Sequence, residues 1–208
     1  LPAALLGAMR VLTDPVETGA ATVSIPQDVQ AEARDWPESL FAERTWHIAR
    51  PLPERSVIAR AAEVIASAGK PLIVAGGGVH YAFAEEALAT LASATGIPVA
   101  ESQAGKGSLN HDHPQSVGAI GSTGTTAANA LAAEADVIIG IGTRYSDFTS
   151  ASRTAFNNPD VRFVNINVAS LDSVKQGGIS VVADAREALQ ALSPALDGYT
   201  VSDEYRTR

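Results

Sequence analysis

The feature that most constrains the fold is an alternation that begins near Pro53 and continues to Leu196. Segments whose apolar residues recur every three or four positions, as in amphipathic helices, are each followed by a short apolar run rich in β-branched residues. Such runs suit strands that are covered on both faces, as the strands of parallel sheets are. The alternation therefore predicts an α/β domain built on a parallel β-sheet flanked by helices.

The same spacing places the individual elements. Gly69 and Gly96 stand where left-handed residues would end the first two helices of this region, and Asp184 stands where it would cap the last helix. The expected helices are 57–68, 84–95, 125–135 and 185–196, and the expected strands are 72–75, 97–100, 137–141, 161–166 and 179–182.

The first 52 residues lack this regularity. Apolar spacing predicts a helix over 1–12, and the run Thr22–Ile25 predicts a strand that Pro26 ends. These two elements cannot bury their apolar faces alone, and the residues that follow are rich in charge and proline. We expect a linker at 29–52 and a central domain at 53–197. The missing initiator Met indicates a piece of a longer protein.

Composition excludes several classes of protein. The 208 residues are 46% hydrophobic and 18% charged, which is typical of globular domains. A net charge of -8 without a basic stripe argues against binding to nucleic acid or anionic membranes. No run approaches the roughly 18 apolar residues that span a bilayer, and the absence of cysteine excludes disulfides and thiolate metal sites. We expect a cytoplasmic protein.

The informative loops follow the predicted strands, because open parallel sheets bind ligands outside the carboxyl ends of their strands. Glycines there leave backbone N–H groups exposed, and a helix N-terminus favours an anion such as phosphate. Arg144 follows a strand and could add a bidentate contact. The residues of this possible nucleotide crevice are Gly76, Gly77, Gly78, Gly121, Gly124, Thr125, Arg144 and Asn167.

These residues also have structural explanations. The glycines Gly76–Gly78 would equally serve close packing of a helix on a strand, and Arg144 is more often a surface ion-pairing residue. The dinucleotide fingerprint is incomplete, because Tyr81 and Tyr145 stand where its third glycine belongs. The run Gly105–Ser108 is no phosphate-binding loop, because Gly107 separates its lysine from its serine.

No catalytic or metal-binding constellation emerges. The His111–His113 segment lies in a polar loop and has no further ligand at helical spacing, so we interpret it as a solvated turn. The serines lack a nucleophile elbow. Glu85 and Glu86 are interpreted as a solvated face of a helix. The sequence therefore predicts no catalytic residue and no metal ligand in this chain.

Four segments, taken in order, carry a family resemblance: Lys70–Val79, Gly96–Val99, Gly121–Asn129 and Asp136–Asp147. Together they resemble the central domain of thiamine diphosphate enzymes, the family of acetohydroxyacid synthase and pyruvate oxidase. The resemblance implies a Rossmann-like α/β fold of the type that binds NAD or FAD in some members.

Three further segments are Ser24–Ala33, Glu101–Ser108 and Arg144–Phe156. They resemble the hydrolases of inositol catabolism within this family, and that resemblance covers essentially the whole chain. It implies a parent enzyme that opens the ring of 3D-trihydroxycyclohexane-1,2-dione to 5-deoxy-glucuronate by cleaving a carbon–carbon bond with water. It also implies that 1–28 ends a preceding pyrimidine-binding domain and that 198–208 begins a linker to a diphosphate-binding domain.

The cofactors implied by the resemblance are thiamine diphosphate and Mg²⁺, held in the parent by a glutamate of the first domain and a Gly-Asp-Gly segment with an Asn in the third. Neither can be placed here, because the only Asp-Gly pair, Asp197–Gly198, lies ten residues from the end. We therefore expect the isolated chain to be inactive. Its expected role is that of a scaffold between its flanking domains in a homo-oligomer.

Nucleotide binding is argued separately. Flavin-binding relatives hold FAD at positions that match Gly76–Gly78, Gly121–Thr125 and Arg144. Relatives with a nucleotide often carry acidic residues at the next strand end, where Asn165–Asn167 is neutral, and this argues against FAD. Two alternatives stay open. One is a free-standing nucleotide-binding or regulatory domain, and the other is an interaction domain that uses residues 1–53.

Overall fold

The computed structural model describes residues 1–207, and the chain forms two compact units. The first unit is Leu1–Ala49 and the second begins at Arg50. The second unit begins three residues before residue 53, the expected start of the central domain. Arg50 and Pro51 belong to it because both contact Asp184. Each unit is described by itself.

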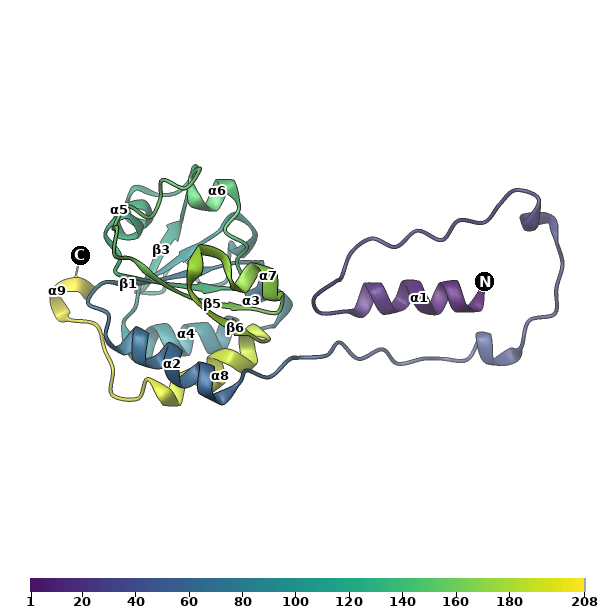
Figure 1. Ribbon diagram of the computed structural model, residues 1–208, viewed down its shortest axis with the longest axis horizontal. Coiled ribbons are helices and arrows are strands. Elements are labelled where there is room, and N and C mark those ends of the chain that lie inside the picture. The colour runs from purple at the N-terminus through teal and green to yellow at the C-terminus, as the bar shows by residue number, and fades with distance from the viewer. Residues whose placement is uncertain (208) are drawn as a thin grey trace. The chain divides into compact units, whose positions relative to one another are not determined.

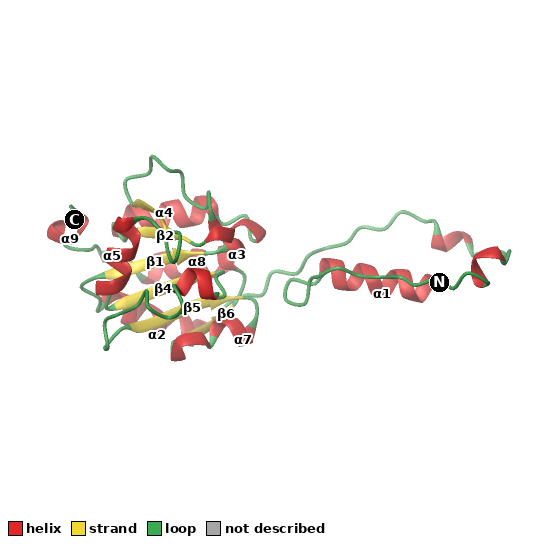
Figure 2. Cartoon of the chain, turned by 90° about the horizontal axis from the view of Figure 1, so that it is seen from above, coloured by secondary structure: helices red, strands yellow, loops and turns green. Residues whose placement is uncertain are grey.

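The second unit is built on a six-stranded sheet whose paired strands are all parallel, which confirms the predicted fold class. Chain order runs outward from the middle of the sheet, first to one edge and then to the other. Figures 1 and 2 show the strands side by side. In spatial order they are β3 (Ser116–Ala119), β2 (Val99–Glu101), β1 (Pro71–Ala75), β4 (Val137–Ile141), β5 (Arg162–Asn167) and β6 (Ile179–Val182).

Helices cover both faces of this sheet (Figure 1). On one face α2 (Arg55–Ala66), α4 (Glu85–Thr95) and α8 (Ala185–Ala195) pack over the larger core, into which β1 points Ile73. On the other face α5 (Thr126–Glu134) packs over a smaller core that receives Leu72 from the same strand. Successive residues of β1 and of β4 therefore enter opposite cores, which explains why the sequences of these central strands are almost entirely apolar.

Most predicted elements are confirmed within a few residues, and the differences have physical causes. Gly96 ends α4 in the left-handed conformation, as predicted. The same prediction for Gly69 is wrong, because α2 already ends at Ser67 and Gly69 does not have a positive φ. The strand β3 was not predicted, because Val117 is its only large apolar residue and all four of its residues are only partly buried.

Asp184 ties the last helix to the start of the second unit. Its carboxylate accepts hydrogen bonds from the backbone N–H groups of Arg186 and Glu187, which confirms the predicted cap of α8. The same side chain, only 6% exposed, forms an ion pair with Arg50 at 2.7 Å. Its own N–H donates to the carbonyl of Pro51. One residue thus fixes both the helix terminus and the incoming chain.

The C-terminal residues also pack on this unit. The backbone N–H of Val201 donates to Thr95, and the Tyr205 hydroxyl donates to the carbonyl of Pro71 at 3.1 Å. Both Val201 and Tyr205 are buried, with Tyr205 on the short helix α9 (Asp203–Arg206). The segment that the sequence assigns to a linker is therefore, over these residues, part of the packed unit.

The first unit is a helix and a largely extended chain. Helix α1 (Pro2–Thr13) matches the predicted helix and has no buried residue. The predicted strand at Thr22–Ile25 is wrong, because this segment lies extended but pairs with no strand among the described residues. A strand forms only when its backbone groups find a partner. Within residues 1–207, no helix has the length and apolarity that crossing a membrane requires.

Replacing Asp184 should destabilise the second unit. In Asp184→Ala the cap of α8 and the Arg50 ion pair are lost together, so we expect the free energy of unfolding to fall by about 2 kcal/mol. Asp184→Asn keeps an oxygen for the cap and should lose roughly half as much. Urea denaturation of the 208-residue chain measures both. The exposed Asp160→Ala is the control, and an equal loss in all three variants would contradict the assignment.

Candidate functional site at the carboxyl edge of the sheet

The carboxyl ends of all six strands lie along one edge of the sheet, where Figure 2 places α3 (Gly77–Tyr81) and α7 (Ser170–Ser173). Between β1 and β4 the chain order changes direction, and open α/β sheets bind ligands at such a switch point. The loops at this point carry Gly76–Gly78 and Gly142–Arg144. The structure therefore brings two of the predicted site segments together.

These two loops contact each other backbone to backbone. A Cβ on Gly76 would lie 2.6 Å from the Cα of Thr143 and would overlap the carbonyl of Gly142. A Cβ on Gly78 would lie 2.5 Å from the Cα of Gly142. Neither distance is possible for a real side chain, so Gly76 and Gly78 serve close packing of the two loops. This is the structural explanation that the sequence left open.

The N–H groups of Gly76, Gly78 and Gly142 have partners within the chain. Gly76 donates to the carbonyl of Ile141 at 2.8 Å, and Gly78 donates to that of Gly142 at 3.0 Å. Gly142 in turn donates to the carbonyl of Ile166 at 2.8 Å. Three of the donors that a bound diphosphate would need are therefore already used by the fold.

The second glycine segment lies at the end of β3, before α5. Gly121 packs against the backbone of Phe148, where an added Cβ would lie 2.9 Å from that residue's carbonyl carbon. Its N–H donates to the Asn129 side chain at 2.9 Å, and the N–H of Gly124 donates to the Gly121 carbonyl. Thr125 caps α5 by accepting from Ala128. These residues again form a packed turn.

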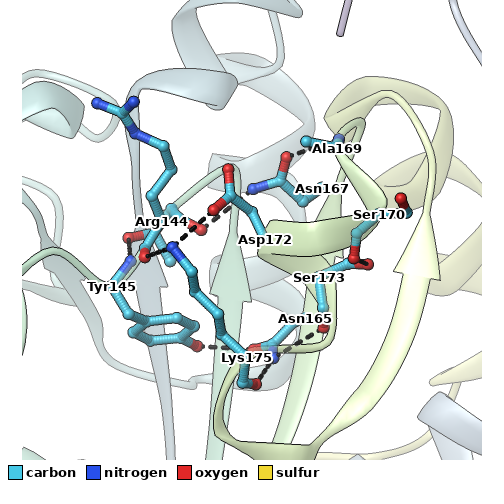
Figure 3. A network of polar contacts seen from close by, with 10 residues as sticks. Arg144, Tyr145, Asn165, Asn167, Ala169, Ser170, Asp172, Ser173 and Lys175 are labelled. Carbon is cyan, nitrogen blue, oxygen red and sulfur yellow. Dashed lines mark hydrogen bonds and ion pairs between the residues drawn. The ribbon is translucent and has the colours of Figure 1, made fainter.

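Arg144 and Asn167 occupy the ends of β4 and β5, as predicted. Asn167 is buried and fully engaged, since its amide donates to the carbonyl of Thr143 and its oxygen accepts from Ala169. Arg144 is exposed, and Figure 3 shows its guanidinium pointing away from the surrounding hydrogen bonds. Its backbone carbonyl, in contrast, accepts from the ammonium of Lys175 at 2.8 Å.

A polar network fixes the backbone around Arg144 (Figure 3). The Tyr145 hydroxyl donates to Asn165 at 2.8 Å, and the Asn165 amide donates to the carbonyls of Ser173 and Lys175. Lys175 also forms an ion pair with Asp172 at 2.7 Å. The loop after β4 is therefore bound to the segment after β5 by side chains that the sequence did not single out.

Tyr145 is the centre of this network and adopts a strained conformation. Its φ of +47° lies in the left-handed region, which is unusual for a large side chain. Its ring is 7% exposed and packs edge-to-face against Phe156 and Phe163. Burial raises the pKa of its hydroxyl well above the ordinary range, so the group remains a neutral hydrogen-bond donor.

A further cluster lies beside this edge, where the chain leaves β2. Glu101, only 9% exposed, accepts N–H groups of Gly107 and Leu109 through one carboxylate oxygen. Residues 106–109 of the loop after β2 line a cleft of about 560 Å³. The other residues of this cleft include Glu85, His111 and His113. The sequence interpretation missed Glu101, because a lone glutamate after an apolar run gives no signal of burial.

The segments that the sequence analysis interpreted as solvated make the following contacts. His113 contacts Ser93 at 3.1 Å, and among the described residues no group of three or more His, Asp or Glu side chains could hold a metal ion. Glu85 is an exception to the solvated-face interpretation, because it accepts a hydrogen bond from His80 at 2.8 Å. The described residues thus supply no ligand set for Mg²⁺.

This chain belongs to the thiamine pyrophosphate enzyme family, because the family model of the central domain matches residues 58–192. This match confirms the family resemblance and the fold expected from it. A solved structure of a putative thiamin diphosphate-dependent enzyme from Mycobacterium smegmatis also has this fold. It superposes with a TM-score of 0.77 at 25% identity, covering 96% of this chain and 38% of that one.

Among curated relatives, the chain is similar to 3D-(3,5/4)-trihydroxycyclohexane-1,2-dione hydrolases. It is 47% identical to hydrolase 2 of Bacillus cereus over 205 residues, which cover 99% of this chain and 32% of that enzyme. It is 43% identical to the hydrolase of Clostridium perfringens over the same shares. The chain therefore spans about a third of the length of these relatives.

Alanine substitutions at the switch point should lower the stability of the chain by different amounts, according to how closely each glycine is packed. Gly76→Ala should reduce the free energy of unfolding by about 3 kcal/mol, because its Cβ would meet rigid backbone. In Gly77→Ala the Cβ would lie 3.3 Å from the Cβ of Ala104, so we expect a loss of about 1 kcal/mol or less. Thermal and urea unfolding of both variants measure this. Equal stability of Gly76→Ala and the unsubstituted chain would refute close packing as the reason for the glycine.

Proposed function

We propose that this chain is the central part of a thiamine diphosphate-dependent hydrolase that opens the ring of 3D-trihydroxycyclohexane-1,2-dione in inositol catabolism. The carrying observation is the 47% identity to a relative of that name over 99% of this chain. The M. smegmatis structure shares the fold of this chain at only 25% sequence identity. The higher identity to the hydrolase therefore supports more than a shared fold. The product expected of the parent is 5-deoxy-glucuronate, formed by hydrolysis of a carbon–carbon bond.

We propose the division of the parent that the family resemblance implies. Residues 1–28 would end a preceding pyrimidine-binding domain, 29–52 would be a linker, and 53–197 would be the central domain. The exposed apolar side chains of α1, among them Leu5 and Leu12, support this role for the first unit, because they would need cover from a neighbouring domain. Residues 198–208 would lead toward a diphosphate-binding domain. The homo-oligomer and the cytoplasmic location stay predictions.

The cofactor is proposed to bind outside this chain. When bound, thiamine diphosphate supplies the carbanion chemistry of the family. The described residues lack a ligand cluster for its Mg²⁺, and the N–H groups of Gly76, Gly78 and Gly142 are bonded within the fold. We therefore assign this chain a structural part in the reaction. It holds the exposed Arg144 and the loop after β2 in place beside the flanking domains.

Catalysis should require the complete gene product. With thiamine diphosphate and Mg²⁺, that protein should consume the cyclic diketone, and omission of the thiamine cofactor should abolish turnover. The 208-residue chain should show no turnover under the same conditions, because it lacks groups that orient the cofactor. Loss of the diketone absorbance and product analysis measure both proteins. Turnover by the short chain, or an inactive complete protein, would contradict the proposal.

The crevice should not bind a nucleotide. Calorimetric titration of FAD, NAD and ADP into the 208-residue chain should show no micromolar binding, because Gly76, Gly78 and Gly142 already use their N–H groups. A flavin-binding member of the family serves as the positive control. Micromolar binding of one nucleotide that Arg144→Ala weakens would instead favour the alternative of a nucleotide-binding domain.

A further inference from the structure

His80 joins three segments at the carboxyl edge of the sheet. It lies in the last turn of α3, and its Nδ1 is 2.8 Å from the Oε1 of Glu85 on α4. Its Nε2 is 3.1 Å from the carbonyl oxygen of Lys106 and 3.4 Å from the hydroxyl of Ser108. Lys106 and Ser108 belong to the loop Gln103–Leu109, which follows β2 and lines the cleft described above.

The partners of His80 define its protonation state. A carboxylate and a backbone carbonyl can only accept hydrogen bonds, so both ring nitrogens must donate for both contacts to form. Only the imidazolium has two N–H groups. The hydrogen bond to Glu85 raises the pKa of His80 above its ordinary value, with a smaller contribution in the same direction from the Lys106 carbonyl.

The same geometry excludes a serine nucleophile. Glu85, His80 and Ser108 are connected in the order of a catalytic triad, but Ser108 is only 1% exposed and cannot meet a substrate. In addition, the Nε2 of His80 donates to the nearer Lys106 carbonyl, so it is not free to accept the proton of the serine. The arrangement therefore holds the loop in place and does not activate the hydroxyl.

The rest of the loop is held by contacts that do not involve His80. Ser102 accepts the N–H of Gly105, and Glu101 accepts those of Gly107 and Leu109. Gly105 packs against the backbone of Ala75, where an added Cβ would lie 2.8 Å from the carbonyl carbon. Both ends of the loop are thus fixed. Between them, the backbone carbonyl of the exposed Lys106 is bound to His80 of α3.

We infer that His80 is a proton-dependent latch: the imidazolium holds the Lys106 segment of the loop against α3 and α4, and the neutral ring releases it. Neutral imidazole has one N–H, so it keeps either Glu85 or the Lys106 carbonyl, and the charged carboxylate is the stronger acceptor. The raised pKa of His80 belongs to the folded state, so the ring is protonated and the latch is complete at low pH. It opens as the pH rises through the folded-state pKa of His80.

The charged groups around His80 leave Glu85 as its main electrostatic partner. On α8, which also packs against α3, Arg186 pairs with Glu187, and Arg50 pairs with Asp184 beside it. Glu101 is engaged by backbone N–H groups. The remaining titratable groups on the adjoining segments and the cleft are Tyr81, Glu86, Lys106, His111 and His113.

The inference goes beyond the proposed hydrolase, and it is tested on the 208-residue chain without substrate. NMR should show the Lys106 and Gly107 amide signals moving with the same midpoint pH as the His80 ring. In Glu85→Gln both midpoints should move together to lower pH, because the charged acceptor is gone. In His80→Gln the loop signals should no longer titrate. His111→Gln, which alters another histidine of the cleft, should leave the midpoint unchanged.

A second readout measures opening of the loop directly. Trypsin cleavage after Lys106 requires the loop to leave α3, and loss of one hydrogen bond should make it about fivefold faster in His80→Gln at neutral pH. His111→Gln should match the unsubstituted chain. Loop signals that do not follow the His80 titration, or equal effects of His111→Gln and Glu85→Gln, would overturn the latch. Failure of the hydrolase assignment would leave these results unaffected.

Discussion

The close contact between Gly76–Gly78 and Gly142 is the constraint on which the carboxyl edge of the sheet depends. It brings the loops after β1 and β4 together at the point where the chain order reverses, and it admits no side chain at Gly76 or Gly78. In nucleotide-binding sheets the same position is a crevice that opens onto free backbone N–H groups. Here the N–H groups of Gly76, Gly78 and Gly142 bond to neighbouring carbonyls, so these three donors at the switch point are used by the backbone itself.

This use of the donors changes what the edge of the sheet can contribute to a reaction. A preformed anion site needs donors that the fold leaves free, and the N–H groups of Gly121 and Gly124 are used as well. What extends outward is a small number of side chains, with Arg144 the clearest case, on a backbone fixed by Tyr145, Asn165 and Lys175. The edge therefore has a fixed backbone around Arg144, and the family model that matches this chain is that of a central domain.

The fold followed from local patterns in the sequence because those patterns report burial on both faces of the strands. Val137–Ile141 is apolar at four of five positions, and this alone separates it from a surface element. The weak strand β3 was missed and the run at Thr22–Ile25 was wrongly predicted to be a strand, because backbone partners decide whether such segments become strands. A single sequence contains no record of those partners.

The candidate site was predictable in position but not in chemistry. Glycines after strands do mark the carboxyl edge, yet whether their N–H groups face a ligand or a carbonyl depends on the approach of loops some 65 residues apart. The sequence could not show which charged side chains are buried and bonded, because their partners are also distant along the chain. Glu101 is buried only because its loop folds back over it, and Asp184 meets Arg50 across 134 positions.

The two halves of this edge differ in how they are held. Around β4 and β5, burial raises the pKa of Tyr145, so its hydroxyl stays neutral and its bond to Asn165 does not depend on a titrating proton near neutral pH. Beside β2 the corresponding tie is the ring of His80, whose pKa Glu85 raises, so this tie depends on a proton that the solvent can remove. The half of the edge held by Tyr145 is rigid, and the half held by His80 is titratable. The loop held by His80 could therefore move while the part around Tyr145 stays in place. The Lys106 segment of the loop Gln103–Leu109 is therefore the part of this edge whose position a change of pH can alter without disturbing the sheet.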